Sequence, residues 1–378
     1  MIGFRLIAVL LALCCAASLA AAGAGPSYPQ DDDERRLWLR ADEEVKKLND
    51  SSQIYKNAEM ELYLDNVVKT LLTREELAAL PLKFRIIRER SCNAFIFPNG
   101  SGYINTGMLA NMENEAQLAT ILAHESIHAI NRHMVKELRD AKDKSALSTV
   151  LGMLTGNLLT PLGHLGAMAS MQGYSRDLEA EADRDGFRLL VRAGYDPYEA
   201  PKVFGALQKE AKAEERKETF FFASHPMLQA RIDNFNALLA GEANGKKGKI
   251  NAEGYLRTFA VLLLENAEMD MKAGHFERAQ DCITRYISAR GEDARACLLM
   301  GETYRRDSKH PDPGKAKELY KKAVRLDPLY PEPYRMLGLI AYKEKDVEVA
   351  RKSLGEYLKL QPGAQDRGYI EGMLKNLR

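Results

Sequence analysis

The sequence lacks an excess of either charge. Its 54 lysines and arginines are almost balanced by 53 aspartates and glutamates, which leaves a formal net charge of +1. A protein that binds nucleic acid usually carries a basic patch, and no basic stripe with interleaved aromatic residues occurs in this sequence. The charge balance therefore argues against nucleic acid as a partner.

Long hydrophobic runs are also missing. A helix that crosses a bilayer needs about 20 consecutive apolar residues, and the N-terminal run at 6–13 is much shorter. That run follows Arg5 and precedes small residues suited to cleavage, so residues 1–24 are predicted to be a secretory signal peptide. We expect export to the bacterial periplasm. A lipoprotein anchored through Cys14 or Cys15 is the alternative, but no small residue stands before either cysteine.

Cysteine is scarce. Beyond the signal peptide only Cys92, Cys282 and Cys297 remain, and this count does not suggest a thiolate metal site. In an oxidising compartment Cys282 and Cys297 would close a loop of about 15 residues, worth roughly 3 kcal/mol, if their helices pack together. The alternative is that the thiols stay free and buried.

What the sequence does contain is the pentapeptide His-Glu-Ser-Ile-His at residues 124–128. Residues 114–123 have an acidic, amide-rich start and apolar residues at helical spacing, so the motif is predicted to lie on a helix. Histidines four residues apart share one helix face, where they bind a zinc ion while the glutamate faces its water. The alternative is a solvated helix face that carries two histidines.

A zinc endopeptidase needs a third protein ligand. A class with a third histidine ten residues after the first is excluded, because Met134 occupies that position. His133 lies five residues after His128, which on a continuous helix turns it away from the ligand face. We therefore expect His133 at the surface.

Residues 174–187 form a second predicted helix, rich in charged and small side chains. Glu179 and Asp183 lie four residues apart on one face of it. In that position Glu179 completes a zinc site with the two histidines, and Asp183 accepts a hydrogen bond from the far nitrogen of a ligand imidazole. The alternative is an exposed helix with ordinary ion pairs.

Further segments follow in a fixed order. They are 97–100, 106–107, 113–119, Ser175-Arg176, 193–197, and 224–226 with Arg231. With the two helices they make residues 30–240 resemble the zinc metallopeptidases of family M48, which include the CAAX prenyl endopeptidase and HtpX, in particular the periplasmic BepA-like branch with C-terminal tetratricopeptide repeats. The resemblance implies one Zn²⁺ per chain, bound by His124, His128 and Glu179, with Glu181 as a neighbour.

The resemblance also singles out His225. In the BepA-like branch the matching histidine approaches the zinc at the position otherwise open for water, which resembles a self-inhibiting switch. In an opened state the same side chain would instead stabilise the oxyanion on the substrate carbonyl. The sequence leaves both roles open, beside that of an ordinary turn residue.

This ligand set implies a mechanism. Zinc lowers the pKa of its water from about 15.7 towards 7. Glu125 takes the proton as that water attacks a peptide carbonyl, and passes a proton to the leaving amine. Glu125 and His225 are therefore the predicted catalytic residues.

Upstream of the motif, short apolar runs indicate strands. Residues 84–88 alternate apolar and basic side chains, 93–97 is a second apolar run, and a turn at 98–102 leads into 103–105. We expect a small sheet with a hairpin beside the zinc helix. Its edge either pairs with an extended substrate chain or only packs on the helix.

Residues 145–175 contain no Asp, Glu, Lys or Arg. Because five glycines and Pro161 interrupt the apolar residues, we expect a buried helical hairpin over the active site, with a membrane segment as the alternative. The resemblance implies a lid or a patch in peripheral contact with a membrane. His164 is assigned a packing or surface role.

The character of the chain changes after residue 240. Residues 241–252 are predicted to be a flexible basic linker, and 253–378 repeat a pattern that resembles the tetratricopeptide motif of about 34 residues, with an insertion near 308–313. Stacked helix pairs form a concave surface suited to extended peptides or partner helices. The alternative is a helical cap that only stabilises the protease.

Together these patterns predict an α+β fold: a mainly helical zincin-type metallopeptidase domain with a small β-sheet, followed by an all-α tetratricopeptide-repeat domain. The predicted function is a periplasmic zinc endopeptidase that cleaves unfolded or misassembled envelope and outer-membrane proteins. Its repeats are expected to contact the outer-membrane assembly machinery. The alternative is a chaperone or assembly factor that binds clients through the repeats and whose protease activity is latent.

Overall fold

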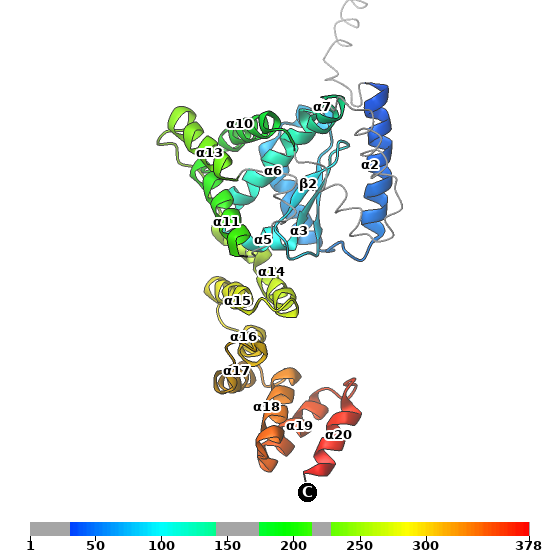
Figure 1. Cartoon of the computed structure of the whole chain (residues 1–378), viewed down its shortest axis with the longest axis vertical. Helices are drawn as coiled ribbons and strands as arrows, with labels where there is room; N and C mark the ends of the chain where they lie inside the picture. Colours follow the sequence, from blue (N-terminus) through cyan, green and yellow to red (C-terminus); the bar gives the residue numbers. More distant parts are fainter. Residues whose placement is uncertain (1–30, 141–173, 214–227, 378) are drawn as a thin grey trace, which may run out of the picture. The chain divides into compact units, whose positions relative to one another are not determined.

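The computed structural model describes residues 31–140, 174–213 and 228–377. Most of them are helical, accompanied by one small sheet, which confirms the predicted α+β class with an all-helical C-terminal part (Figure 1). The chain divides into two compact units. The first comprises Met1–Ile86, Ala94–Tyr103 and Ala119–Lys249, and the second comprises Ile87–Asn93, Ile104–Leu118 and Ile250–Arg378.

The described part of the first unit begins with the helices α2 (Asp32–Asp50), α3 (Ala58–Leu71) and α4 (Arg74–Ala79). Helix α3 begins where the Asn57 side chain accepts a hydrogen bond from the backbone nitrogen of Met60. Its buried residues are Met60, Leu64, Val67, Val68 and Leu71. This spacing of three and four residues is that of an amphipathic helix packed on a core.

The sheet has the strand order β1-β3-β2, with β1 at Lys83–Ile87, β3 at Ser101–Asn105 and β2 at Ala94–Ile96. A tight turn joins β2 to β3, and in it Gly100 has a φ of +84°, which glycine adopts without strain. The predicted strands and hairpin are therefore confirmed. Strand β2 is an edge strand of this sheet.

Two helices carry the predicted site residues that the structure describes, α6 (Glu115–Ile130) and α10 (Arg176–Arg192). Residues 114–129 are all buried, which confirms a helix for the motif and excludes a solvated helix face. The two helices approach closely at Gly186, where an added Cβ atom would lie 3.2 Å from the backbone nitrogen of His124. The absence of a side chain at Gly186 thus lets α10 bring its carboxylates up to α6.

The remaining elements that the structure describes in the first unit are α7 (His133–Asp140), the 3-10 helix η1 (Pro197–Glu199), α11 (Ala200–Ala213) and α13 (Leu228–Glu242). Helices α11 and α13 pack through the stacked rings of Phe204 and Phe235, whose centroids are 5.1 Å apart. The segment after α13 ends at Lys249, whose backbone pairs with that of Tyr195 in an isolated bridge. The predicted linker is therefore fixed to this unit at that point.

The second unit contains the repeated helix pairs. They are α14 (Ala252–Lys272) with α15 (Phe276–Arg290), α16 (Ala294–Arg306) with α17 (Pro313–Leu326), and α18 (Pro331–Glu344) with α19 (Val347–Leu360), followed by α20 (Arg367–Asn376). Small residues allow close packing within a pair: an added Cβ at Gly301 would lie 2.5 Å from the Tyr320 ring. The predicted helical repeats, and the insertion between α16 and α17, are confirmed.

Helix α5 (Thr106–Asn111) belongs to this second unit, although the zinc helix follows it directly in the sequence. It packs on α14: the Tyr255 hydroxyl donates to the Leu109 carbonyl at 2.5 Å, and the Asn266 amide donates to the Thr106 carbonyl at 3.1 Å. Both donors are buried. The sequence patterns did not predict this association between segments far apart in the chain.

The three cysteines of the described chain, Cys92, Cys282 and Cys297, are free thiols. Cys92 and Cys297 are buried and Cys282 is half-buried, so the structure agrees with free thiols but not with full burial of all three. Burial raises the pKa of Cys282 to about 12, so its thiol stays protonated at neutral pH.

Within the described ranges, no helix combines the length and the apolarity that crossing a bilayer requires. The predicted signal peptide lies outside these ranges, as do all but the last two residues of the uncharged stretch 145–175. The predictions made for those segments therefore stay predictions.

We expect Gly186→Ala and Gly205→Ala to differ in stability, although both glycines lie in helices where alanine is intrinsically favoured by about 1 kcal/mol. At Gly205 an added Cβ meets no atom within 4 Å, so alanine should raise the free energy of unfolding. At Gly186 the added Cβ crowds α6. We therefore expect Gly186→Ala to leave the free energy of unfolding unchanged or to lower it by about 1 kcal/mol. Urea unfolding measures both, and equal stabilisation would contradict the close helix approach.

Candidate metal centre

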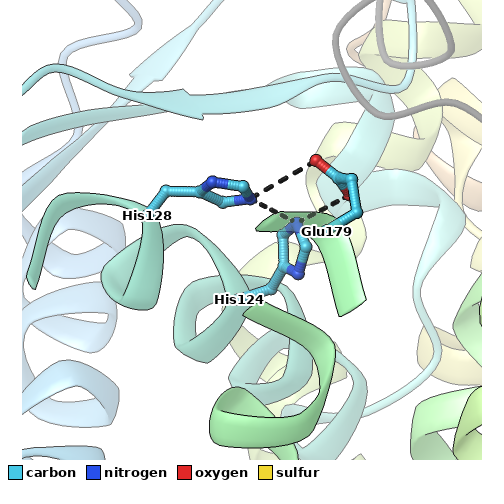
Figure 2. A group of neighbouring side chains, drawn as sticks. All are labelled: His124, His128 and Glu179. Carbon is cyan, nitrogen blue, oxygen red and sulfur yellow. Dashed lines mark hydrogen bonds and ion pairs between the residues drawn. The ribbon is translucent and has the colours of Figure 1, made fainter. Parts of the chain in front are cut away.

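Three side chains from two helices converge in the first unit (Figure 2). The Nε2 atoms of His124 and His128 lie 3.0 Å apart. Glu179 lies across from them, with one carboxylate oxygen 3.5 Å from Nε2 of His128 and the other 3.6 Å from Nε2 of His124. Within the described ranges this is the one group of three or more such side chains that could bind a metal ion.

The separations fit a zinc ion. Ligand atoms placed tetrahedrally at about 2.0–2.1 Å from zinc lie about 3.3 Å from one another. The observed separations of 3.0, 3.5 and 3.6 Å lie on either side of that value. Two imidazoles and one carboxylate are also a ligand set that zinc accepts while a fourth position stays open.

Asp183 lies behind His124, one turn after Glu179 on α10. Its carboxylate oxygen is 3.1 Å from Nδ1 of His124, the ring nitrogen that faces away from the convergence point. A neutral imidazole that uses Nε2 as a ligand carries its proton on Nδ1. A zinc-bound His124 would donate from Nδ1 to Asp183, beside Nη2 of Arg231, which lies 2.9 Å from the same nitrogen.

Arg231 on α13 compensates the negative charge of these carboxylates. Its Nη2 lies 2.6 Å from Asp183, and its Nη1 lies 3.3 Å from Glu179. The guanidinium also lies over the Phe204 ring, 4.2 Å from the centroid. Burial by itself would lower the pKa of Arg231, but the charges of Asp183 and Glu179 outweigh it and raise the pKa, so the side chain stays cationic.

His133 is fully buried, so the prediction of a surface position is wrong. Helix α6 ends at Ile130, and Arg132 has a left-handed backbone with a φ of 59° before α7 begins. The helical periodicity used for the prediction is interrupted there. His133 consequently turns back to the site, where its Nδ1 is 3.0 Å from Nδ1 of His128.

Tyr174 covers the other side of His128. Its ring stacks on the imidazole at a centroid distance of 4.0 Å and an interplanar angle of 20°. Burial raises the pKa of Tyr174, and the charges of Glu125 and Glu179 raise it further, so the phenol is neutral. The negative charge of Glu125 also raises the pKa of Arg231, and Glu125 is itself buried.

The structure therefore brings most of the predicted site residues together. They are His124, Glu125, His128, Glu179 and Asp183, all of them buried. His225 lies outside the described ranges. Sequence reasoning gave no role to Tyr174 or Arg231 and misplaced His133, for which the Asn131-Arg132 pair at the end of the apolar helix pattern was the available signal of a turn.

Comparisons with known proteins concern the family of the chain. Residues 58–239 match the family model described as Peptidase family M48. The beta-barrel assembly-enhancing protease of Escherichia coli is 27% identical over 199 residues, 50% of this chain and 40% of that protein. The mitochondrial metalloendopeptidase OMA1 of Saccharomyces cerevisiae is 34% identical over 157 residues, 39% of this chain and 44% of that protein.

The chain spans less than half the length of these curated relatives. Among solved structures, the TPR2AB-domain:pHSP90-complex of yeast Sti1 covers 72% of this chain and 99% of its own, at 14% identity and a TM-score of 0.28. That score is too low to indicate a shared overall fold.

Replacing Arg231 by methionine would leave two buried carboxylates without their guanidinium. We expect the free energy of unfolding to fall by about 3–5 kcal/mol, because an uncompensated buried charge is strongly destabilising. Asp183→Asn in the same chain removes one of the negative charges and should restore part of the loss. Denaturant unfolding in a chelating buffer measures the effect without any metal contribution.

Arg188→Met is the matched control for this prediction. Arg188 also pairs with a carboxylate, Glu242, but its side chain is 53% exposed. Solvent screens an exposed pair of this kind, so we expect stability close to that of the unmodified chain. An equal loss in the two variants would contradict a special role of the buried guanidinium.

Proposed function

We propose, from the peptidase family M48 domain that residues 58–239 form, that this chain is a zinc-dependent endopeptidase. The observation that carries the proposal is the convergence of His124, His128 and Glu179 in a buried site, at separations that fit zinc. The relatives reported above are named as a protease and a metalloendopeptidase.

The three converging side chains would bind one zinc ion per chain. When bound, zinc would polarise the substrate carbonyl and make a water molecule acidic enough to attack it near neutral pH. Glu125 accepts the proton of the attacking water and delivers it to the leaving amine. Asp183 fixes the orientation and tautomer of His124, and Arg231 in turn fixes Asp183.

The substrate is proposed to be an extended polypeptide bound along β2. This strand is at an edge of the sheet, and its last residue, Ile96, lines a small cavity together with His128 and Tyr174. An edge strand pairs with the main chain of its ligand and reads little of the side-chain sequence. We therefore infer selection for unfolded chains.

The cellular role is proposed from the relatives and the N-terminus. The Escherichia coli relative is named for the assembly of beta-barrels. This name supports the proposal that misassembled outer-membrane proteins are the substrates. The signal-peptide pattern at residues 1–24 supports export to the periplasm. The repeated helix pairs would bind clients or the assembly machinery.

Glu125→Gln should abolish cleavage of an unfolded protein while leaving zinc bound, because it removes the base and none of the ligands. Glu179→Ala should lose the zinc as well, because it removes a ligand. Metal content and cleavage are measured on the same preparations of the full chain. Glu43→Gln, an exposed residue of α2, serves as control. A chain that folds without stoichiometric zinc, or that keeps it after Glu179→Ala, would refute the site.

His225→Ala tests the predicted switch. If His225 blocks the open zinc position, the variant should cleave an unfolded protein faster than the unmodified chain does. If His225 instead stabilises the oxyanion, the rate should fall by about 100-fold or more. Stoichiometric zinc with no cleavage by either protein would favour the alternative of a client-binding assembly factor.

A further inference from the structure

Within the described ranges, His133 is the one buried histidine near the metal centre that the proposed chemistry does not use. It is 0% exposed and lies at the first position of α7, directly after the turn that ends α6. Its Nδ1 is 3.0 Å from Nδ1 of His128. A contact between two ring nitrogens at this distance is a hydrogen bond in which one ring donates and the other accepts.

The direction of this hydrogen bond follows from the ligand role of His128. Its Nε2 is the atom that converges with Nε2 of His124 and with Glu179, so Nδ1 carries the proton of the neutral ring. His128 therefore donates and His133 accepts. The proton of His133 is then on Nε2, which faces a carboxylate oxygen of Glu181 at 3.5 Å.

Glu181 is itself fixed by neighbours from the same part of the fold. The Asn131 amide donates to its carboxylate at 2.7 Å, and the Lys136 ammonium lies 3.3 Å away. Glu181 was predicted only as a neighbour of the third ligand. Its contacts instead orient the far side of His133.

The turn that directs His133 inward is also locked. Arg132 has the left-handed conformation, and its guanidinium donates to both oxygens of Glu34, at 2.8 and 2.6 Å. Glu34 is buried, so this pair is shielded from water. The position of His133 is therefore determined by specific polar contacts, those of Arg132 with Glu34 and those of Glu181 with its neighbours.

We propose that His133 is a positioning residue for the zinc ligand His128, by accepting its Nδ1 proton. Asp183 is proposed to accept the Nδ1 proton of His124 in the same way, so each ligand imidazole would have its own hydrogen-bond acceptor. Acceptors of this kind fix the ring orientation and raise the basicity of the ligand nitrogen. The inference rests on the zinc site of the proposed function, and its direct consequence is tighter zinc binding.

The test is the zinc dissociation constant of the full chain, measured by competition with a chelator at one pH. His133→Leu fills the space without an acceptor and should raise the constant by about 10–100-fold. His133→Asn places an amide oxygen near the former Nδ1 and should restore most of the affinity. If the leucine variant does not fold, His133→Gln replaces it, because its longer side chain moves the amide away from the Nδ1 position.

Leu64→Ala, a core truncation on α3, which carries none of the proposed site residues, controls for lost stability. This control should lower the midpoint of thermal unfolding but leave the zinc dissociation constant and the visible spectrum of the cobalt-substituted protein unchanged. His133→Leu should change the zinc dissociation constant and the cobalt spectrum. Equal zinc binding by the unmodified chain and His133→Leu would overturn the inference while leaving the proposed function intact. The same holds if His133→Asn binds as weakly as His133→Leu. Absence of zinc from the unmodified chain would overturn both.

Discussion

Two carboxylates on α10 are buried beside two imidazoles on α6, and burial of negative charge is unfavourable unless positive charge compensates it. Arg231 supplies that charge from a third helix, so α6, α10 and α13 depend on one another through a single cluster. The small volume of Gly186 sets how closely the first two helices approach. Electrostatics and packing thus select the same arrangement, which is also the arrangement that fits a metal ion.

The parts of the site that were predictable are local. His124, Glu125 and His128 follow from the period of one helix, and Glu179 with Asp183 from the period of another. His133 was misplaced because the helical period was extended through Arg132, where the backbone turns into the left-handed region. A non-glycine residue adopts that conformation rarely, and the Asn131-Arg132 pair was the one local sign of the turn.

The same limit applies to the fold. The strands, the hairpin and the repeated helix pairs have periodic sequence patterns and were predicted. The association of α5 with α14 leaves no periodic pattern in the sequence and joins segments about 150 positions apart. The buried carbonyls of Leu109 and Thr106 receive their donors from Tyr255 and Asn266. Such pairings satisfy backbone groups and appear only in three dimensions.

The packing of α5 on α14 also determines when these two helices can reach their final contacts during translation. Translation proceeds from the N-terminus, so α5 leaves the ribosome well before α14 exists, at about 5–20 residues per second. Until then the carbonyls of Leu109 and Thr106 lack these two donors. Because α6 follows α5 almost directly, the start of the histidine-bearing helix reaches its final surroundings only once the first repeat has been made. The order of translation therefore makes this helix–helix contact a late step in the folding of the chain.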